Sequence, residues 1–288
     1  MTPLYVSDLD GTLLHSDATL SPFSRDTLND LLAQGLQFTV ASARSIITMQ
    51  TVLSGLQLRL PIIEFNGTFI TDLHTGRHLD VCALEPTIVD DILAQACAAD
   101  LEPFVSTYDD TADRLYYHEP PNEGMRWHWQ NRVAAKDPRL CYLDDLRRAL
   151  TEQVVCFTMI GRLQQVAALD ETLRAAYDGL IETHLYENQY SLGWHWLTIH
   201  DRRAGKEKAI QTLITLAGLK PSELVVFGDQ VNDLAMLRMA QRGIAMRNAV
   251  PDLQRTATQI IGANDDDSVA RFIAADWSGQ NGRYPTKG

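Results

Sequence analysis

Residues 4–12 of the chain read LYVSDLDGT. The apolar start of this stretch predicts a short buried strand that ends at acidic residues. Alternation places Asp8 and Asp10 on the same side of the extended segment, and Gly11 then lets the backbone turn away. Because ligands of open α/β sheets bind at the carboxyl ends of strands, the stretch predicts a ligand site there. An ordinary acidic turn is the alternative interpretation.

A second acidic stretch, GDQVND at residues 228–233, also follows an apolar strand and opens a helix. Asp229 lies at the end of that strand, and Asp233 lies one turn into the helix. Each acid by itself is also typical of a helix N-terminus. Together the two stretches supply four carboxylates, which repel one another unless a cation intervenes. An all-oxygen set of ligands favours Mg²⁺ over zinc or copper.

The segments around these stretches alternate between strand and helix. Ser21 before Pro22 predicts a helix start, and Gly35 predicts the end of that helix. This rhythm implies right-handed crossovers and a parallel sheet, so we predict an α/β fold with a Rossmann-like parallel sheet as its core. Strands are expected at residues 36–41, 61–65 and 224–227, and a helix at 206–217.

The middle of the chain has a different pattern. A hairpin is expected over residues 69–83, and helices and aromatic-rich strands then mix until the first pattern returns near residue 200. We therefore predict an α/β core that is split between residues 1–83 and 197–288. An α+β cap domain is expected between them, at residues 84–196.

Two further residues have a suggestive position. Ser42 follows the strand expected at 36–41, where a hydroxyl and nearby amides can hold a phosphate oxygen. Lys206 begins a helix, where a positive charge opposes the helix dipole, and this misfit indicates a role beyond solvation. Taken singly, the two residues are also typical of a turn and of a solvated surface charge.

In this order along the chain, the features resemble the four motifs of the haloacid dehalogenase superfamily. Within it, the chain resembles the Cof-type phosphatases with a large inserted C2-type cap. The resemblance extends over nearly the whole chain and includes the turn Asn66-Gly67 and the segment 243–249. Ala43 and Arg247 depart from the residues usual in this subgroup, so catalysis is carried over more safely than substrate specificity.

The resemblance implies Mg²⁺-dependent hydrolysis of a small phosphomonoester, such as a sugar phosphate, a nucleotide or a phosphorylated cofactor, through an aspartyl-phosphate. Asp8 is expected to be the nucleophile, and Asp10 the general acid and base. The expected metal ligands are Asp8, Asp10 through its carbonyl, and Asp229, with Asp233 supporting them. The remaining expected site residues are Ser42, Lys206 and Asn232 for phosphate binding and Arg44, Asn66 and Asn248 as candidates for substrate contacts.

Other outcomes of the same residues stay open at this point. A phosphomutase or phosphotransferase would use the same core, with a sugar in place of water as the acceptor. A non-catalytic phosphate-binding regulatory module would also keep the pocket, although the intact acidic residues and Lys206 weigh against it. The segments 127–129 and 194–196, both Trp-His-Trp, are expected to pack within the cap rather than to form a specificity surface.

Composition limits the partners. The chain has 288 residues, with 25 Lys and Arg against 37 Asp and Glu, and its net charge of −12 argues against a nucleic-acid polymer or an anionic membrane as partner. No apolar run reaches the length of a membrane span, and the N-terminus lacks the basic region of a signal peptide. Four scattered cysteines are expected to be free thiols of a cytoplasmic protein. We expect a small phosphorylated metabolite as partner, a monomer by default, and a tail at 281–288.

Overall fold

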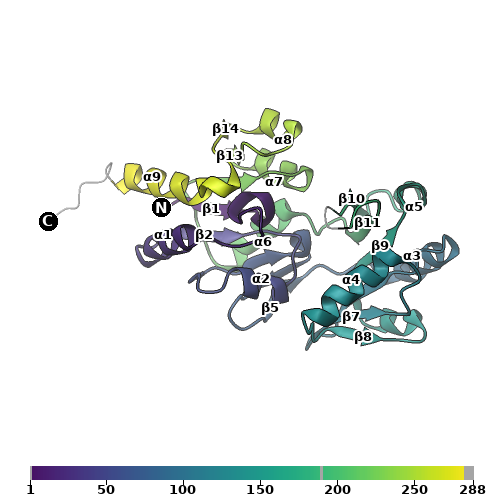
Figure 1. Ribbon diagram of the computed structural model, residues 1–288. Helices are drawn as coiled ribbons and strands as arrows, with labels where there is room; N and C mark the ends of the chain where they lie inside the picture. Colours follow the sequence, from purple (N-terminus) through teal and green to yellow (C-terminus); the bar gives the residue numbers. More distant parts are fainter. Residues whose placement is uncertain (1, 189–190, 282–288) are drawn as a thin grey trace. The chain divides into compact units, whose positions relative to one another are not determined.

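The structure is a computed structural model that describes residues 2–188 and 191–281 (Figure 1). The chain forms two compact units. The core unit comprises Met1–Asp80 and Gly205–Gly288, and the inserted unit comprises Val81–Ala204. The inserted unit extends past residue 196, where the sequence placed the boundary, because the strand at His195–Asp201 belongs to its sheet. Residue 281 ends the last helix, and the rest of the expected tail lies outside the described residues.

The core unit is built on a five-stranded sheet in the order β14-β13-β12-β1-β2. Every pairing between neighbouring strands in this sheet is parallel. Val6 of β1, for example, lies between Val226 of β12 and Thr39 of β2. Strands β12 and β1 in the middle of the sheet are buried along their whole length, as their continuous apolar runs predict. The expected Rossmann-like α/β core is therefore confirmed. Its strands are β1 (Leu4–Ser7), β2 (Gln37–Val40), β12 (Leu224–Gly228), β13 (Arg242–Ala245) and β14 (Gln259–Ile260).

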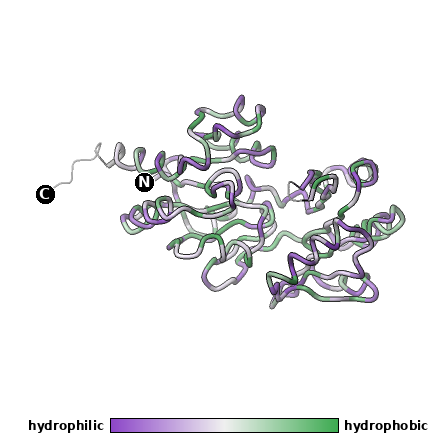
Figure 2. Tube along the Cα trace, viewed as in Figure 1, coloured by the Kyte–Doolittle hydropathy of each residue, from purple (hydrophilic) through white to green (hydrophobic). Residues whose placement is uncertain are grey.

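The helices of the core unit are amphipathic and bury their apolar faces in a single cluster with this sheet. In Figure 2 the helical segments alternate between green and purple along their length, as amphipathic helices do. The first helix begins where the sequence predicts, because Ser21 accepts a hydrogen bond from Ser24 N at 2.9 Å and Pro22 occupies the first helical position. The helices are α1 (Pro22–Ala33), α2 (Ile46–Val52), α6 (Lys206–Leu216), α7 (Leu234–Met239), α8 (Pro251–Thr256) and α9 (Ser268–Asn281).

A small sheet of three strands adjoins β2 in the core unit. It contains β3 (Ile62–Glu64), β4 (Phe69–Thr71) and β5 (His78–Val81), in that order. β3 and β4 pair in antiparallel fashion, and Ile63 makes a parallel bridge to Ala41. The short turn η2 (Phe65–Gly67) joins β3 to β4. The small sheet thus brings residues 62–66 beside the segment that follows β2.

The inserted unit is an α+β domain with a six-stranded sheet in the order β10-β11-β9-β6-β7-β8. All its pairings are antiparallel except that of β7 with β8. Helices α3 and α5 pack with one apolar cluster of this sheet, and α4 packs with a second cluster (Figure 1). The elements are α3 (Pro86–Ala98), β6 (Phe104–Tyr108), β7 (Asp113–Tyr117), α4 (Glu123–Ala134), β8 (Leu140–Tyr142), η3 (Leu146–Thr151), β9 (Gln153–Gly161), α5 (Leu163–Ala176), β10 (Ile181–Glu187) and β11 (His195–Asp201).

The two Trp-His-Trp segments pack within the inserted unit. Trp127 belongs to α4 and Trp196 to β11, and their rings meet edge to face with centroids 6.0 Å apart. Trp196 is 3% exposed, and Trp129 and Trp194 pack against the same cluster. The packing interpretation of these segments is therefore supported. None of the described helices is long and apolar enough to span a membrane.

Candidate active site

Three neighbouring parallel strands end at the same edge of the core sheet, and polar residues follow each of them. Asp8 comes directly after β1, Asp229 directly after β12, and Ser42 two residues after β2. The ladder continues past the strands, because Asp8 N donates to Phe227 O at 3.0 Å. The carboxyl ends of parallel strands thus bring residues from distant parts of the sequence to one place.

Lys206 joins two of the acidic residues at this edge. Its Nζ donates to Oδ1 of Asp8 at 2.6 Å and to Oδ1 of Asp233 at 2.7 Å. Lys206 is 2% exposed, so these are charge-assisted bonds in a site nearly closed to water. The lysine that the sequence marked as a misfit at the start of α6 is therefore held by two carboxylates.

Asp233 and Asp229 are held from their other sides. Oδ2 of Asp233 accepts hydrogen bonds from the backbone N–H groups of Asp229, at 3.0 Å, and Gln230, at 3.2 Å. Asp229 accepts from the Thr12 hydroxyl at 2.9 Å and from the Gln230 amide at 3.1 Å. Thr12 and Gln230 were not among the predicted site residues, although both stand inside the two acidic stretches. Position within a motif was the only signal for them.

Burial and mutual repulsion shape the electrostatics of this cluster. Burial raises the pKa of Asp8 well above its ordinary value, and the charges of Asp233 and Asp229 add to the rise, while Lys206 opposes it. Burial followed by the charge of Asp233 raises the pKa of Asp229 to about 6. Burial of the Lys206 ammonium lowers its pKa, but the carboxylates of Asp233 and Asp8 outweigh this and hold the pKa above its ordinary range. A single lysine thus leaves the three carboxylates incompletely compensated.

The same carboxylates could hold a metal ion. Asp8, Asp229 and Asp233 each offer an oxygen, and these oxygens lie within 4.8 Å of one another. All three residues are buried, and burial, with the charges of the neighbouring carboxylates, raises the pKa values of Asp8 and Asp229. The oxygen donors fit a hard divalent cation such as Mg²⁺. The three carboxylates therefore fit a divalent metal ion.

Asp10 lies outside that cluster. Its carboxylate makes a two-pronged ion pair with Arg44, with Nε at 2.7 Å from Oδ2 and a terminal guanidinium nitrogen at 2.6 Å from Oδ1. The side chain of Asp10 is 54% exposed, whereas that of Arg44 is 22% exposed. The predicted alternation of Asp8 and Asp10 on one side of an extended segment is not observed, because Leu9–Leu13 form the helical turn η1 and Asp10 pairs with Arg44.

Close backbone approach allows the cluster to form. Gly11 has a φ of +74°, and a Cβ there would collide with the carboxylate of Asp229. At Gly228 a Cβ would collide with the side chain of Asp233. The packing of the acidic side chains therefore favours glycine at both positions, and at Gly11 the positive φ favours it as well.

The other predicted residues lie around this cluster. The Ser42 hydroxyl accepts from Arg44 N at 3.2 Å, and Asn66 N donates to Ser42 O at 2.9 Å. Asn232 donates from its amide to the Asn66 side-chain oxygen at 3.1 Å. Asn248 donates to Gly11 O at 2.8 Å and thereby supports the turn after Asp10.

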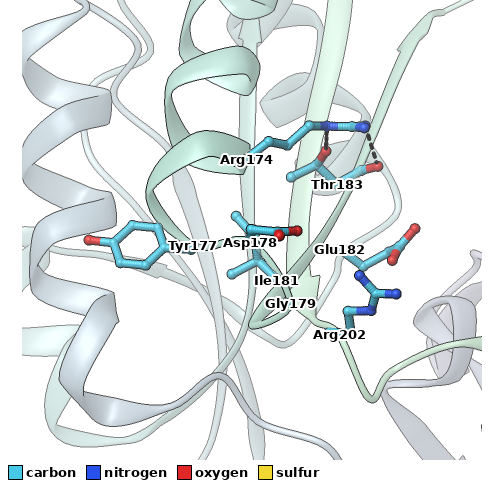
Figure 3. A pocket seen from close by; sticks show the side chains of 8 residues that line it. All are labelled: Arg174, Tyr177, Asp178, Gly179, Ile181, Glu182, Thr183 and Arg202. Carbon is cyan, nitrogen blue, oxygen red and sulfur yellow. Dashed lines mark hydrogen bonds between the residues drawn. The ribbon is translucent and has the colours of Figure 1, made fainter.

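The inserted unit contains a separate cavity of about 300 Å³ that involves none of the predicted site residues (Figure 3). Arg174 is one of the lining residues and donates to the Thr183 hydroxyl at 2.7 Å and to the Thr183 carbonyl at 3.2 Å. Arg174 belongs to α5 and contacts the edge strand β10. These contacts indicate that the arginine satisfies backbone and side-chain groups of the sheet edge. The lining residues are Arg174, Tyr177, Asp178, Gly179, Ile181, Glu182, Thr183 and Arg202.

Comparison with known proteins gives consistent matches over nearly the whole chain. A sequence model of the family described as haloacid dehalogenase-like hydrolase matches residues 5–273. The chain is 25% identical over 280 residues to the 5-amino-6-(5-phospho-D-ribitylamino)uracil phosphatase YitU of Bacillus subtilis, covering 94% of this chain and 96% of that one. It is 28% identical over 288 residues to the pyridoxal phosphate phosphatase YbhA of Escherichia coli, covering 94% and 97%. A solved haloacid dehalogenase-like hydrolase from Bacteroides thetaiotaomicron shares the fold, with a TM-score of 0.77 and 22% identity over 96% of this chain and all of that one.

Proposed function

The chain belongs to the haloacid dehalogenase-like hydrolase family and is a phosphoric monoester hydrolase, and we propose that it hydrolyses a small phosphorylated metabolite through an aspartyl-phosphate. The resemblance inferred from the four sequence motifs is thereby confirmed at the level of the family. Beyond the family, we propose a substrate class, the chemical steps and the roles of the individual residues.

One observation carries the proposal: a buried carboxylate at the end of β1 is held by a buried ammonium. Asp8 is 6% exposed and receives a 2.6 Å hydrogen bond from Lys206. A carboxylate fixed in this way is a nucleophile with one orientation, which is how positioning contributes to a reaction rate. The Lys206 ammonium also provides positive charge where a phosphate oxygen would approach.

The proposed reaction has two steps. In the first, a carboxylate oxygen of Asp8 bonds to phosphorus, the bond from phosphorus to the ester oxygen breaks, and Asp10 donates its proton to the leaving alkoxide. In the second, Asp10 takes a proton from a water molecule whose oxygen attacks the same phosphorus. The bond between phosphorus and the Asp8 oxygen breaks, inorganic phosphate leaves, and the Asp8 carboxylate is restored. One residue serves as acid and then as base because the first step leaves it deprotonated.

Arg44 links the resting state to this cycle. In the structure its guanidinium holds the Asp10 carboxylate with two short, charge-assisted bonds. A phosphate group presents the same forked pair of acceptors as a carboxylate. We therefore propose that the incoming phosphate takes over the guanidinium and frees Asp10 to act as the acid. Ser42 and Asn232, which both make hydrogen bonds with Asn66, are proposed to bind the phosphate oxygens.

Magnesium is the proposed cofactor. Asp8, Asp229 and the carbonyl of Asp10 are the proposed ligands, and the ion would neutralise the charge that an anionic nucleophile and an anionic substrate bring together. Asp233 is proposed to act differently, because one of its oxygens holds the Lys206 ammonium and the other accepts two backbone N–H groups. Its role is to hold Lys206 and the loop that carries Asp229.

The substrates of the relatives support a proposal for the substrate class. The two phosphatases named above act on 5-amino-6-(5-phospho-D-ribitylamino)uracil and on pyridoxal phosphate. Both compounds are small phosphomonoesters that carry a nitrogen heterocycle, and we propose a metabolite of this kind for this chain. The inserted unit, Val81–Ala204, is proposed to act as the cap over the substrate. We also propose a cytoplasmic protein, because all four cysteines are free thiols, and a monomer by default.

The test is phosphate release from a generic aryl phosphate, followed by a panel of phosphorylated metabolites. The parent protein is expected to release inorganic phosphate without any acceptor, whereas Asp8→Asn is expected to be inactive. Asp26→Asn, which changes an exposed carboxylate of α1, is the matched control and should retain full activity. Phosphate appearing only on an added sugar would replace hydrolysis by phosphotransfer. An Asp8→Asn protein as active as the parent would remove Asp8 from the role of nucleophile.

A further inference from the structure

The segment between β2 and α2, which carries Ser42 and Arg44, is tied to the β3 segment by several hydrogen bonds. Ser42 N donates to Ile63 O at 2.9 Å, Asn66 N donates to Ser42 O at 2.9 Å, and Phe65 N donates to Arg44 O at 3.1 Å. These three bonds involve only backbone atoms. The loop that presents Arg44 is therefore built against a second segment rather than standing alone.

One more tie depends on a side chain. Oε2 of Glu64 accepts a short hydrogen bond from the backbone N–H of Ile46, the first residue of α2. Ser45 stands at the capping position of that helix but makes no side-chain capping bond. Glu64, from the neighbouring strand β3, thus accepts the hydrogen bond of a backbone N–H at the start of α2 that the Ser45 side chain does not accept.

The other oxygen of Glu64 is fixed as well. Oε1 accepts from the Thr71 hydroxyl at 2.5 Å, and the same hydroxyl lies 2.7 Å from Nδ1 of His78. Because the hydroxyl proton is directed to Glu64, Nδ1 of His78 is the donor in the second bond. His78 in turn stacks on Phe69, with ring centroids 4.1 Å apart. The carboxylate is held in one orientation from both sides.

This arrangement is costly to build. Glu64 is 0% exposed, and burying a carboxylate is unfavourable unless hydrogen bonds compensate it. The two residues that follow it, Phe65 and Asn66, have φ values of +48° and +56°, a region that residues other than glycine rarely adopt. Strain of this kind is concentrated at functional sites. Asn66 then meets Asn232 of the Asp229 loop through its side chain.

We propose that Glu64 is a positioning residue for the phosphatase reaction: it fixes the start of α2 and thereby sets where Ser42 and Arg44 meet the phosphate. The proposal rests on the proposed function, because those two residues are its phosphate contacts. In this proposal Glu64 acts on the phosphate contacts through the Ile46 N–H. Thr71 and His78 hold its carboxylate in the orientation that this bond requires.

The test compares four variants of the full chain. Glu64→Ala removes the bond to Ile46, and Glu64→Gln keeps an acceptor for that N–H and a polar group for Thr71. Thr71→Val removes the hydroxyl at nearly constant volume, so that it remains informative if Glu64→Ala does not fold. The matched control is Asp170→Ala in the inserted unit, which also loses a buried carboxylate that accepts a 2.5 Å bond from a threonine.

Two measurements separate positioning from simple stability. Kinetics on an aryl phosphate, at a temperature where each variant is folded, should give a kcat/KM for Glu64→Ala about 10- to 100-fold below the parent, with a raised KM. Glu64→Gln should recover most of this loss, and Thr71→Val should fall between the two. Asp170→Ala should lower Tm but leave both kinetic constants unchanged. Hydrogen exchange should show residues 42–47 exchanging roughly tenfold faster in Glu64→Ala and Thr71→Val, with the strands of the sheet unaffected.

Unchanged kcat and KM in Glu64→Ala, or in Thr71→Val if Glu64→Ala is unfolded, would overturn the proposal. A Glu64→Gln protein as impaired as Glu64→Ala, or unchanged exchange over residues 42–47, would overturn it as well. Failure of the proposed function looks different. In that case the parent releases no phosphate, or Asp8→Asn matches the parent, whatever the exchange experiment reports for the loop.

Discussion

Lys206 and Asp8 form a buried ion pair in which Nζ lies 2.6 Å from the carboxylate, although 198 residues separate them in the sequence. The Lys206 side chain is 1% exposed, and that of Asp8 is 9% exposed. Breaking a buried ion pair by removing one partner leaves the other charge uncompensated. The lysine therefore matters for stability as well as for chemistry.

Replacing Lys206 should destabilise the protein strongly. Lys206→Met leaves Asp8 and Asp233 buried without their cation, and removing one member of a buried pair costs about 3–5 kcal/mol of unfolding free energy. Urea unfolding in metal-free buffer measures this loss, and phosphate release should disappear with it. Adding Asp233→Asn to Lys206→Met should recover part of the stability, because it removes one of the stranded charges. A Lys206→Met protein as stable as the parent would contradict the ion-pair account.

Magnesium should stabilise the protein more at about pH 7.5 than at about pH 4.5. The pKa of Asp229 rises from its ordinary 3.8 to about 6, through burial and then the charge of Asp233, and the pKa of Asp8 shifts in the same direction. Between these values the metal-free folded protein holds more protons than the unfolded chain. Its stability therefore falls as the pH rises through this window, and a bound cation relieves the cost at the upper end.

Thermal unfolding with Mg²⁺ or with excess chelator, at both pH values, measures this difference. Asp229→Asn should reduce both the stabilisation by Mg²⁺ and its dependence on pH. Asp26→Asn, at the exposed site on α1, should change neither. An equal increase in Tm at the two pH values, or none at either, would count against the carboxylate cluster as the metal site.

Removing Arg44 should affect activity far more than stability. Its ion pair with Asp10 is partly exposed, and pairs of this kind contribute at most about 1 kcal/mol. In contrast, Arg44→Ala should lower kcat/KM on an aryl phosphate by about 10- to 100-fold, since it removes a positioning contact. Arg44→Lys should restore little, because an ammonium lacks the planar fork. Arg25→Ala, which removes an exposed arginine of α1, is the control, and an Arg44→Ala enzyme with parental kcat/KM would exclude the proposed role.

His200 should make the inserted unit sensitive to acid. Burial, and then the proximity of His184, lowers the pKa of His200 to about 3. The unfolded chain therefore binds more protons between pH 3 and 6.5, and the stability that neutral His200 provides is lost as the pH falls through this window. The loss amounts to about 2 kcal/mol at about pH 5. His200→Gln should be less sensitive, as judged from Tm at neutral and acidic pH, and an identical pH dependence in the two proteins would rule out His200 as the cause.

The sequence predicts the sheet and the acidic residues at its edge because those features depend on local patterns. A short apolar run followed by acidic residues and glycine specifies a buried strand with a turn after it, and parallel strands necessarily end at one edge. The positions of Asp8 and Asp229 at that edge could be predicted in this way, whereas Lys206 was indicated by its misfit with the helix dipole. The start of α1 at Ser21 also follows from a local pattern. Near residue 196 the division of the structure into units differs from the predicted boundary, because pairing with β9 and β10 makes His195–Asp201 one strand of the inserted unit.

The partners of the polar side chains were decided only by the tertiary structure. Nothing near Asp10 in the sequence indicates that its carboxylate turns to Arg44 rather than to the acidic cluster. Likewise, no local pattern marks Glu64 as the residue that holds the start of α2. Such bonds form between segments that packing brings together, and a buried polar group must take whichever partner lies within reach. The sequence by itself therefore determined which chemical groups reach the edge of the sheet, and the fold determined which of them hold one another there.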